Sequence, residues 1–592
     1  MLPLFHYQDV QKMVSMSFTQ YRKLRPGGPA DAIAASSLFG AAMLATPTIG
    51  ATIGQPAIAA ALGLSAGGAA WAAYRWIEAT KNKHIFDAKF YINSAEPPFP
   101  YNGERRSDGV LLGYCVDNGK PLFVTYEELM RHVFILGQSG VGKTVLGEFI
   151  MAQHIMNGGG LMMIDGKMDS KNLEAIYRYC KWAGREDDLY VINPGDPDMS
   201  NTYNPILTGD PDEVSARNLL LIPSTENSPG ADHFKQEANQ GITTLVAALQ
   251  KAGMAYTFID ISILLMSSKA LMHLESIVPD SEEKTNYSIF LDKFRQVDKE
   301  GNSTIDTKRL KETFGGIGGR MFTFGTGKFG KVTNHTSPDI SLFDGMIQKK
   351  IIYIALPTMG KDTAAQNFGR MAVGDLRTAI SWMQALPDDQ KPWPPFYGFF
   401  DEAGSYVNNS WSRMFEQARS ARVILNPAVQ TLANFDAISP ELQEMVIGNT
   451  LTKVFFKVGT QDSAERVGDL IGLEERPVIG LSDSSGSGAS AVSNDMSFSS
   501  GLSDSASIGF SERSSEEYKV SPDQLKALGR GEAIVTYGGS EVFHIKIPLL
   551  STTEELNEEL GPVRLNKHRR KWVRSIDLFK KADQFISAGK KR

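Results

Sequence analysis

The sequence predicts an α/β protein whose parallel sheet is covered by helices on both faces and interrupted by a helical unit. From His132 onward, short apolar runs alternate with glycine-containing loops and amphipathic stretches, as in HVFIL, GQSGVGKT, VLGEFIMAQHIM and GGGLMMID. Such alternation is typical of strands and helices that build a parallel sheet. Residues 210–315 instead hold long helical stretches and no clear strand, and the strand pattern resumes at KKIIYIALP. We therefore expect the sheet to be split around the helical unit.

The remaining strands are predicted from apolar runs bounded by turn residues. Residues 86–125 mix short apolar runs with proline and Asn-Gly or Asp-Gly pairs, which indicates a β-rich lead-in. Beyond the helical unit, PFYGFFDEA, ARVILNPAVQ and LTKVFFKVG extend the sheet, and EAIVTYG with VFHIKIP predicts a final hairpin. Residues 481–515 are dominated by Ser, Gly and Ala, so we expect a flexible loop there, although the alternation in MSFSSG permits edge strands.

Length and composition limit the kind of protein. The chain has 592 residues, more than the roughly 250–300 at which one hydrophobic core stops growing, so several structural units are expected. A net charge of −6 argues against a protein that coats nucleic acid with its whole surface, and confines any such contact to a patch or channel. The two cysteines, Cys115 and Cys180, exclude a disulfide framework and a Cys-type zinc site, and fit a reducing compartment.

An uncharged stretch near the N-terminus predicts a membrane hairpin. No charged residue occurs between Asp31 and Arg75, a stretch long enough for two spans of ~20 residues joined by a turn near Gly54-Gln55-Pro56. Lysine and arginine flank the stretch on both sides, so the positive-inside rule places both ends in the cytoplasm. A pair of buried alanine-rich helices is the alternative. On the membrane reading, everything after residue 80 is cytoplasmic.

A phosphate-binding loop is predicted between an apolar strand and an amphipathic helix. The segment GQSGVGKT has the Walker A spacing and comprises Gly137, Gln138, Ser139, Gly140, Val141, Gly142, Lys143 and Thr144. Its glycines let backbone N–H groups face phosphate oxygens, and the N-terminus of the following helix adds positive potential. We expect Lys143 to reach the β and γ phosphates of ATP, and Thr144 to bind Mg²⁺.

Two consecutive acids end a later strand. A bound nucleotide requires a carboxylate near its Mg²⁺ and a group that activates the attacking water. In FYGFFDE, Asp401 is the predicted Mg²⁺ partner and Glu402 the predicted general base, because ligands bind at the carboxyl ends of strands in open α/β sheets. The same pair alone is also compatible with the start of a helix.

Further strand ends carry polar candidates. Gln430 ends ARVILNPAVQ, where its amide is placed to sense the γ phosphate or position water, or to act as a solvated cap. Asp165 and Lys167 end the strand that follows the P-loop helix, and they form an ion pair beside the nucleotide or a purely structural pair.

Arginines and an aromatic segment complete the candidates. Between the two acids and Gln430 lie Arg413, Arg419 and Arg422, and we consider Arg419 or Arg422 a finger that reaches the nucleotide of an adjacent subunit. The segment GRMFTFGTGKFGKV places Lys328 and Lys331 among Phe322, Phe324 and Phe329, which predicts either a loop that contacts a nucleic-acid strand or a core strand with a turn.

The order of these motifs resembles the type IV coupling proteins, which are hexameric inner-membrane ATPases of bacterial conjugation and type IV secretion. The resemblance rests on the hairpin, GQSGVGKT, IDGKMD, the NTYNPI segment with Asn204 and Pro205, the helical insertion, FFDEAG, ARSARVILNPAVQ and GRGEAIVTYGG. It covers most of residues 30–550. The short connection between the two spans and the long Ser/Gly-rich stretch depart from the family pattern.

The resemblance implies a P-loop NTPase with a RecA-like parallel sheet and an all-α domain. It also implies a homo-hexamer that binds ATP and Mg²⁺ and feeds single-stranded DNA with its relaxase, or protein effectors, to secretion-channel proteins. The alternatives are a DNA-pumping ATPase of chromosome segregation or repair, and a membrane receptor that ATP only assembles. The expected organisation is a two-helix membrane segment (1–80), the nucleotide domain in two parts (81–209 and 326–550), an all-α domain (210–325) and a basic tail (551–592), which is a candidate docking site for an adaptor.

Overall fold

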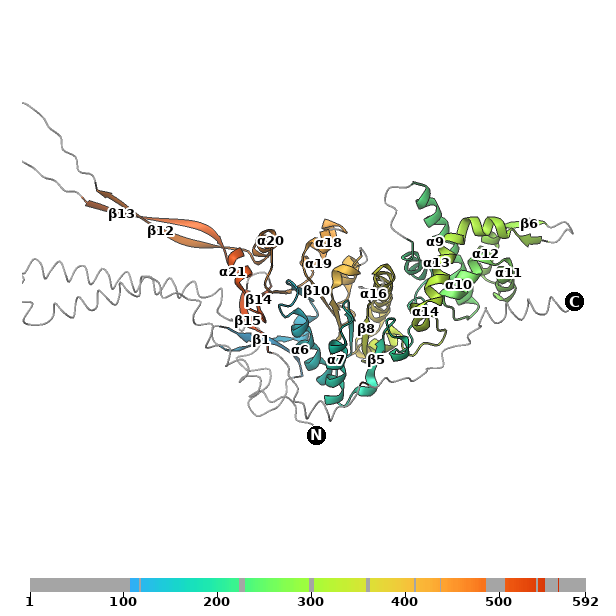
Figure 1. Cartoon of the computed structure of the whole chain (residues 1–592), viewed down its shortest axis with the longest axis horizontal. Coiled ribbons are helices and arrows are strands. Elements are labelled where there is room, and N and C mark those ends of the chain that lie inside the picture. The colour runs from blue at the N-terminus through green and yellow to red at the C-terminus, as the bar shows by residue number, and fades with distance from the viewer. Residues whose placement is uncertain are drawn as a thin grey trace, which may run out of the picture.

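The computed structural model describes residues 107–548, except 117–118, 223–228, 298–302, 358–361, 409–410, 437, 486–505 and 539–540, together with residue 563 (Figure 1). The predicted membrane hairpin, most of the β-rich lead-in and almost all of the basic tail lie outside the described residues. Within them, no helix combines the length and the apolarity that a membrane span requires.

A single large sheet forms the centre of the molecule. Eleven strands follow the order β2-β1-β15-β14-β11-β3-β10-β9-β4-β8-β5. The seven strands from β11 to β5 are parallel, which confirms the predicted α/β class. They are β3 (Val133–Leu136), β4 (Leu161–Asp165), β5 (Leu189–Ile192), β8 (Ile351–Ala355), β9 (Phe396–Asp401), β10 (Val423–Val429) and β11 (Thr452–Phe455).

The other edge of the sheet is antiparallel. The predicted final hairpin is present as β14 (Glu532–Tyr537) and β15 (Glu541–Lys546), and β14 pairs with β11. The described end of the lead-in supplies β1 (Gly109–Cys115) and β2 (Pro121–Thr125), and β1 pairs with β15. Chain segments from both ends of the described region therefore extend the same sheet.

Alternate residues of the central strands enter two different cores. Phe134 and Leu136 of β3 belong to one hydrophobic cluster, whereas Val133 and Ile135 belong to another. This is the two-residue period of a strand that is buried on both faces, and it explains why the strands read as continuous apolar runs. The longer helices of the sheet region are α6 (Lys143–Met156), α7 (Ser170–Trp182), α16 (Asp362–Ala385), α17 (Trp411–Gln417), α19 (Pro440–Gly448) and α20 (Gln461–Ile471).

Helices also dominate the segment between β5 and β8, as predicted (Figure 1). One difference from the prediction is a short two-stranded antiparallel hairpin at the far end of this unit, which connects two helices. The elements are α8 (Pro211–Leu219), α9 (Pro229–Lys251), α10 (Phe258–Met266), α11 (Ser268–Ile277), α12 (Glu282–Asp292), β6 (Arg295–Val297), β7 (Ser303–Ile305), α13 (Thr307–Thr326), α14 (Lys328–Thr333) and α15 (Leu342–Ile347).

The aromatic segment that the sequence presented as a loop or a strand is helical. Its residues belong to α13 and α14. Phe324 and Phe329 are buried and stack on each other with ring centroids 5.3 Å apart, so they are not available to bases. Lys328, Lys331 and Phe322 remain exposed. Burial of the two rings against the helical unit overrides the turn signal of the surrounding glycines.

A buried ion pair ties the helical unit to a helix of the sheet region. Arg217 on α8 donates to the carboxylate of Asp375 on α16 at 2.8 Å, and both side chains are at most 3% exposed. Tyr203 and Thr208 also donate to this carboxylate, so both of its oxygens have hydrogen-bond partners. Asn204 of the predicted Asn-Pro element donates to the carbonyl oxygens of Tyr256 and His335, which gives it a structural role in the same junction.

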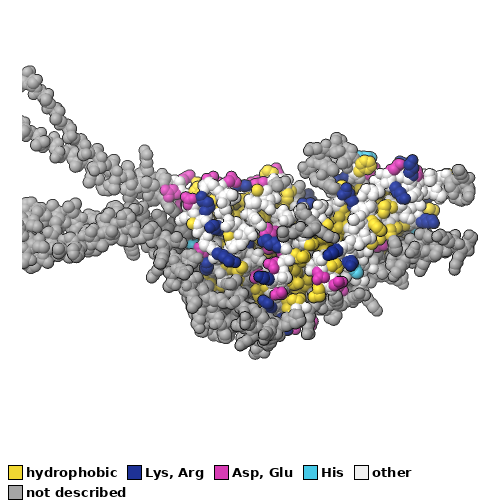
Figure 2. Space-filling model, in the orientation of Figure 1, with side chains coloured by type: hydrophobic (Ala, Val, Ile, Leu, Met, Phe, Trp, Pro, Cys, Tyr) yellow, Lys and Arg dark blue, Asp and Glu magenta, His cyan; other side chains and the backbone are white. Residues whose placement is uncertain are grey.

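The predicted Ser/Gly-rich loop is partly a ribbon. Strands β12 (Leu473–Ser485) and β13 (Ala506–Tyr518) pair antiparallel and project away from the sheet (Figure 1). Residues 481–485 and 506–515 are therefore extended strands, contrary to the loop prediction, because backbone pairing is available at every position of the two segments. Elsewhere on the visible face, acidic and basic side chains are interspersed rather than segregated by sign (Figure 2).

Candidate nucleotide site

The P-loop connects β3 to α6 in the way that its sequence predicts. Gly140 and Gly142 have φ values of 78° and 124°, which favour glycine because a Cβ would be strained there. Gly137 needs glycine for another reason, since a Cβ at this position would lie 2.5 Å from Cβ of Phe456. The glycine spacing therefore sets both the curl of the loop and its close approach to the residue that follows β11.

Lys143 is folded over its own loop. Its Nζ donates to the carbonyl oxygens of Gly137 at 2.6 Å and Gln138 at 3.0 Å, and the side chain is 4% exposed. Burial lowers the pKa of this ammonium group, although the neighbouring Glu402 opposes the effect. Phosphate oxygens would be stronger acceptors than these neutral carbonyls, so the lysine is placed to exchange them for a ligand.

Thr144 and Asp401 meet across the sheet. Oγ1 of Thr144, at the start of α6, donates to Oδ2 of Asp401 at 3.2 Å. Asp401 ends β9 and is buried, and burial raises the pKa of its carboxyl group. A hydroxyl and a carboxylate oxygen at this spacing suit Mg²⁺, which takes few protein ligands and keeps waters and phosphate oxygens for the rest. The structure thus brings together the two predicted metal ligands.

Glu402 is held on two sides. Lys167 Nζ donates to its Oε1 at 2.6 Å, and Gln430 Nε2 lies 2.9 Å and 2.8 Å from the two carboxylate oxygens. Burial alone would raise the pKa of Glu402, but Lys167 and Gln430 outweigh it, so the pKa is lowered. The residue also has a left-handed backbone, with φ of 51°. Gln430 therefore lies beside the predicted base rather than at a solvated cap.

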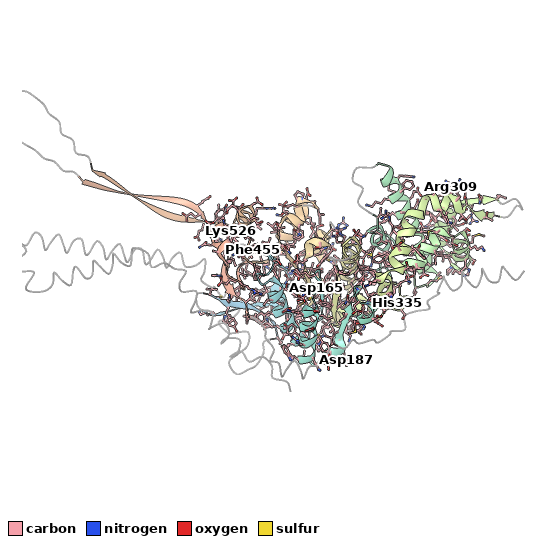
Figure 3. The ribbon with its side chains drawn as sticks, in the orientation of Figure 1. Asp165, Asp187, Arg309, His335, Phe455 and Lys526 are labelled. Carbon is pink, nitrogen blue, oxygen red and sulfur yellow. The ribbon has the colours of Figure 1, made fainter. Side chains whose placement is uncertain are left out.

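The predicted pairing of Asp165 with Lys167 is wrong. The Lys167 side chain turns to Glu402, and Asp165 Oδ1 accepts the backbone N–H groups of Lys167 and Met168. Its Oδ2 accepts from Tyr353 at 2.6 Å and from Asn172 at 2.9 Å. Asp165 lies at the end of β4 in the middle of the sheet region (Figure 3). A buried carboxylate at the start of a loop accepts hydrogen bonds from the nearby backbone N–H groups, so the lysine side chain pairs with another acid.

Glu148 is an acid of the site that the sequence reasoning missed. It lies on α6 one turn beyond Thr144, and burial together with Asp169, Asp401 and Asp165 raises its pKa to about 7. The helical spacing from the P-loop was the available signal, since residues four apart share a helix face.

The chain is similar to known proteins over the region that holds several of these residues. Residues 395–529, which hold Asp401, Glu402 and Gln430, match the family described as the TraM recognition site of TraD and TraG. Over 387 residues the chain is 24% identical to the type 4 coupling protein DotL of Legionella pneumophila subsp. pneumophila, covering 57% of this chain and 49% of DotL. Over these residues the chain is similar to the type IV coupling proteins. It spans about half the length of that curated relative.

Solved structures are also similar to this chain at low sequence identity. The unbound monoclinic form of the bacterial conjugative coupling protein TrwB superposes with a TM-score of 0.48 at 13% identity, covering 78% of this chain and 92% of that one. VirB4 of Thermoanaerobacter pseudethanolicus gives a TM-score of 0.43 at 14% identity, with coverages of 76% and 98%.

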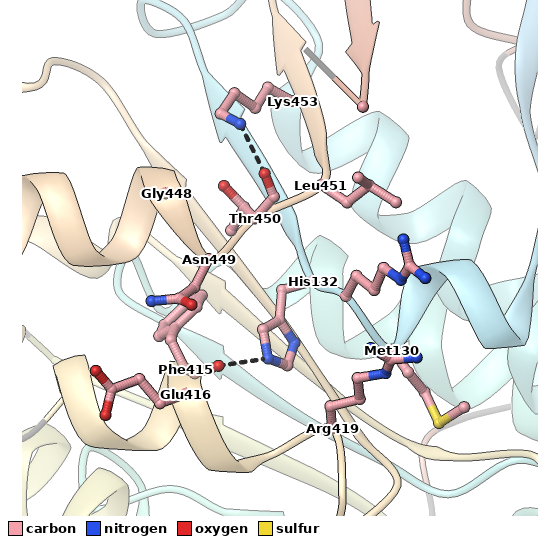
Figure 4. A pocket seen from close by; sticks show the side chains of 12 residues that line it. Met130, His132, Phe415, Glu416, Arg419, Gly448, Asn449, Thr450, Leu451 and Lys453 are labelled. Carbon is pink, nitrogen blue, oxygen red and sulfur yellow. Dashed lines mark hydrogen bonds between the residues drawn. The ribbon is translucent and has the colours of Figure 1, made fainter.

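The candidate arginines of this chain have different surroundings. Arg422 lies over the Trp393 ring at 5.8 Å and donates to the Lys391 carbonyl oxygen at 3.4 Å, so its guanidinium is engaged within the subunit. Arg419 instead lines a cavity of about 730 Å³ at the end of the parallel strands opposite to the P-loop (Figure 4). Arg413 is exposed on α17 and lines no part of this cavity.

The cavity around Arg419 is basic. Arg131 and Lys453 line it together with the acid Glu416. His132 also borders it but is neutral, because burial lowers its pKa to about 4, and its ring bonds the Phe415 carbonyl oxygen and the Leu425 N–H. Arg131 and Lys453 were not among the predicted residues. Their positions next to the starts of β3 and β11 gave no pattern that distinguishes them from surface residues.

Proposed function

We propose that this chain is a coupling protein of type IV secretion or conjugation. It is a ring-forming ATPase of the bacterial inner membrane that recruits single-stranded DNA with its relaxase, protein substrates, or both, and powers their transfer to secretion-channel proteins. The observation that carries the proposal is the convergence of Lys143, Thr144, Asp401 and Glu402 at one end of the parallel sheet. The similarity of this chain to the coupling proteins supports the proposed kinds of cargo.

The residues divide the work of ATP hydrolysis. The loop N–H groups of Gly137–Thr144 and the Lys143 ammonium bind phosphate oxygens. Thr144 and Asp401 hold Mg²⁺, which neutralises phosphate charge when it is bound with the nucleotide. Glu402 accepts a proton from the attacking water, and Gln430 orients that carboxylate through its two amide contacts. The P-loop residues, Asp401, Glu402 and Gln430 thus each have a role in the proposed reaction.

The same proposal includes the organisation of the chain. Residues 1–80 anchor the protein through two membrane helices, and 81–209 with 326–550 form a RecA-like nucleotide domain around the all-α domain at 210–325. Such a split is supported by the seven parallel strands that lie on both sides of the helical segment in sequence. Homo-hexamers would place each nucleotide site between subunits.

The test of motor function is Glu402→Gln. The variant keeps the shape of the side chain and its contact with Gln430 but cannot take up a proton at neutral pH. We expect it to bind ATP and to hydrolyse it about 10²- to 10⁴-fold more slowly, since that is the usual cost of losing a general base. Cargo transfer in cells should stop. Transfer at the parental level by a non-hydrolysing variant would instead indicate a receptor that ATP only assembles.

The basic tail provides a separate test of cargo recruitment. Residues 564–592 concentrate lysine and arginine with apolar residues at helical spacing, which favours an amphipathic helix that docks an adaptor or cargo. Removing them should leave basal ATPase activity unchanged, because every proposed catalytic residue lies upstream, and should reduce cargo transfer. A truncated chain that transfers cargo at the parental rate would contradict a docking role.

A further inference from the structure

Lys167 has no role in the mechanism described above, yet it contacts the predicted base. Its Nζ lies 2.6 Å from Oε1 of Glu402, while Gln430 occupies both oxygens of the same carboxylate. A general base needs a free oxygen within hydrogen-bond reach of the water that it deprotonates. The Lys167 ammonium therefore occupies an oxygen of the carboxylate that Gln430 orients, and in this arrangement Glu402 is not ready for catalysis.

The position of Lys167 is built into the fold. Asp165 accepts the backbone N–H groups of Lys167, Met168 and Asp169, which fixes the loop after β4. Gly166 lets this loop approach the end of β9, because a Cβ there would lie 2.9 Å from Cβ of Glu402 and 3.1 Å from the Asp401 carbonyl oxygen. The loop that places Lys167 beside Glu402 is thus held by its own hydrogen bonds and close packing, and the contact is not a chance one at the surface.

Lys167 also belongs to the phosphate side of the site. Lys143 and Lys167 repel each other electrostatically, and both attract Asp401 and Glu402. In this structure Lys143 is bonded to loop carbonyls and Lys167 to a carboxylate, so each ammonium has a partner supplied by the protein itself. A terminal phosphate would compete for both.

Exchange of the Lys167 partner is inexpensive. The Lys167 side chain is 41% exposed, and ion pairs of that exposure contribute little net stability because water screens them. A phosphate group with two negative charges attracts an ammonium more strongly than a single carboxylate does. The long, flexible lysine stem can follow the stronger partner without a change in the backbone.

We propose that Lys167 changes partner from the Glu402 carboxylate to the terminal phosphate when ATP binds, and thereby releases Glu402 to activate water. The inference rests on the proposed ATPase function and adds to it a residue that recognises the triphosphate. Lys167 then binds the γ phosphate directly, whereas ADP, which lacks that phosphate, leaves the lysine on Glu402. The base is available only when there is a phosphoryl group to transfer.

The experiment measures nucleotide affinity in the full-length protein by competition with a fluorescent ADP. The competitors are ADP and a non-hydrolysable ATP analogue, each with Mg²⁺. Lys167→Met should weaken binding of the analogue about tenfold, the usual effect of losing one charge-assisted contact, and leave ADP affinity nearly unchanged. Lys167→Arg should restore the preference for the triphosphate. Lys171→Met is the matched control, because Lys171 is an exposed lysine on the neighbouring helix. This variant should bind both nucleotides with the affinity of the parent protein.

A second measurement separates phosphate recognition from simple masking of the base. In a Glu402→Gln background the carboxylate partner of Lys167 is gone. Lys167→Met should still lower the affinity for the ATP analogue more than the affinity for ADP. If Lys167 only masks Glu402, then Lys167→Met would keep the parental ratio of analogue to ADP affinity and would hydrolyse ATP faster, which overturns the inference. The proposed function fails separately, if Lys143→Ala hydrolyses ATP normally.

Discussion

Lys143→Ala should abolish ATP hydrolysis and cargo transfer. The ammonium group is the one cation seated within the curled P-loop, and its removal leaves the phosphates without their principal point charge. The fold should survive, because the lysine bonds only two carbonyl groups of its own loop, and both can bind water instead. Hydrolysis is measured on purified full-length protein with Mg²⁺, transfer is measured in cells, and thermal unfolding checks the fold.

The control for Lys143 is Lys269→Ala, which removes an exposed lysine from α11, remote in sequence from every predicted site residue. It should hydrolyse ATP and transfer cargo as the parent does. Normal transfer by a well-expressed Lys143→Ala protein would contradict the motor proposal as a whole, since no other described lysine is bonded to the P-loop carbonyls.

Arg419→Ala should lower ATP hydrolysis about 10³-fold or more while nucleotide binding within the subunit is retained. That is the usual loss when an arginine finger is removed. A ring repeats one head-to-tail contact, so each subunit presents two different surfaces to its neighbours. The Arg419 cavity and the P-loop lie at opposite ends of β3, which allows the cavity of one subunit to face the nucleotide of the next.

Mixed rings test whether Arg419 acts between subunits. A Lys143→Ala subunit still carries Arg419, and an Arg419→Ala subunit still carries an intact P-loop. Mixing the two inactive proteins should therefore restore part of the hydrolysis, whereas Arg413→Ala, on the exposed side of α17 just before Arg419, should be active alone. Two inactive variants that remain inactive at every mixing ratio would contradict action in trans.

Local patterns in the sequence determined the strands and the positions of the acids Asp401 and Glu402. A strand that is buried on both faces is apolar throughout, so β3, β4, β8, β9 and β10 could be predicted one by one. The P-loop could be predicted because its glycines are required by the local backbone conformation, which has positive φ at Gly140 and Gly142. Asp401 and Glu402 followed from their place at the end of an apolar strand.

Only the tertiary structure decided which partners the remaining polar residues take. Lys167 turns to Glu402 rather than Asp165, because backbone N–H groups occupy the Asp165 carboxylate. Arg422 differs from Arg419 in its contact with the Trp393 ring. The sequence around the two arginines does not predict this difference. The glycine-rich end of α13 is helical because Phe324 and Phe329 gain burial in the helical unit. Sequence periodicity reports which face of an element is buried, whereas these choices depend on groups that folding brings together from distant positions.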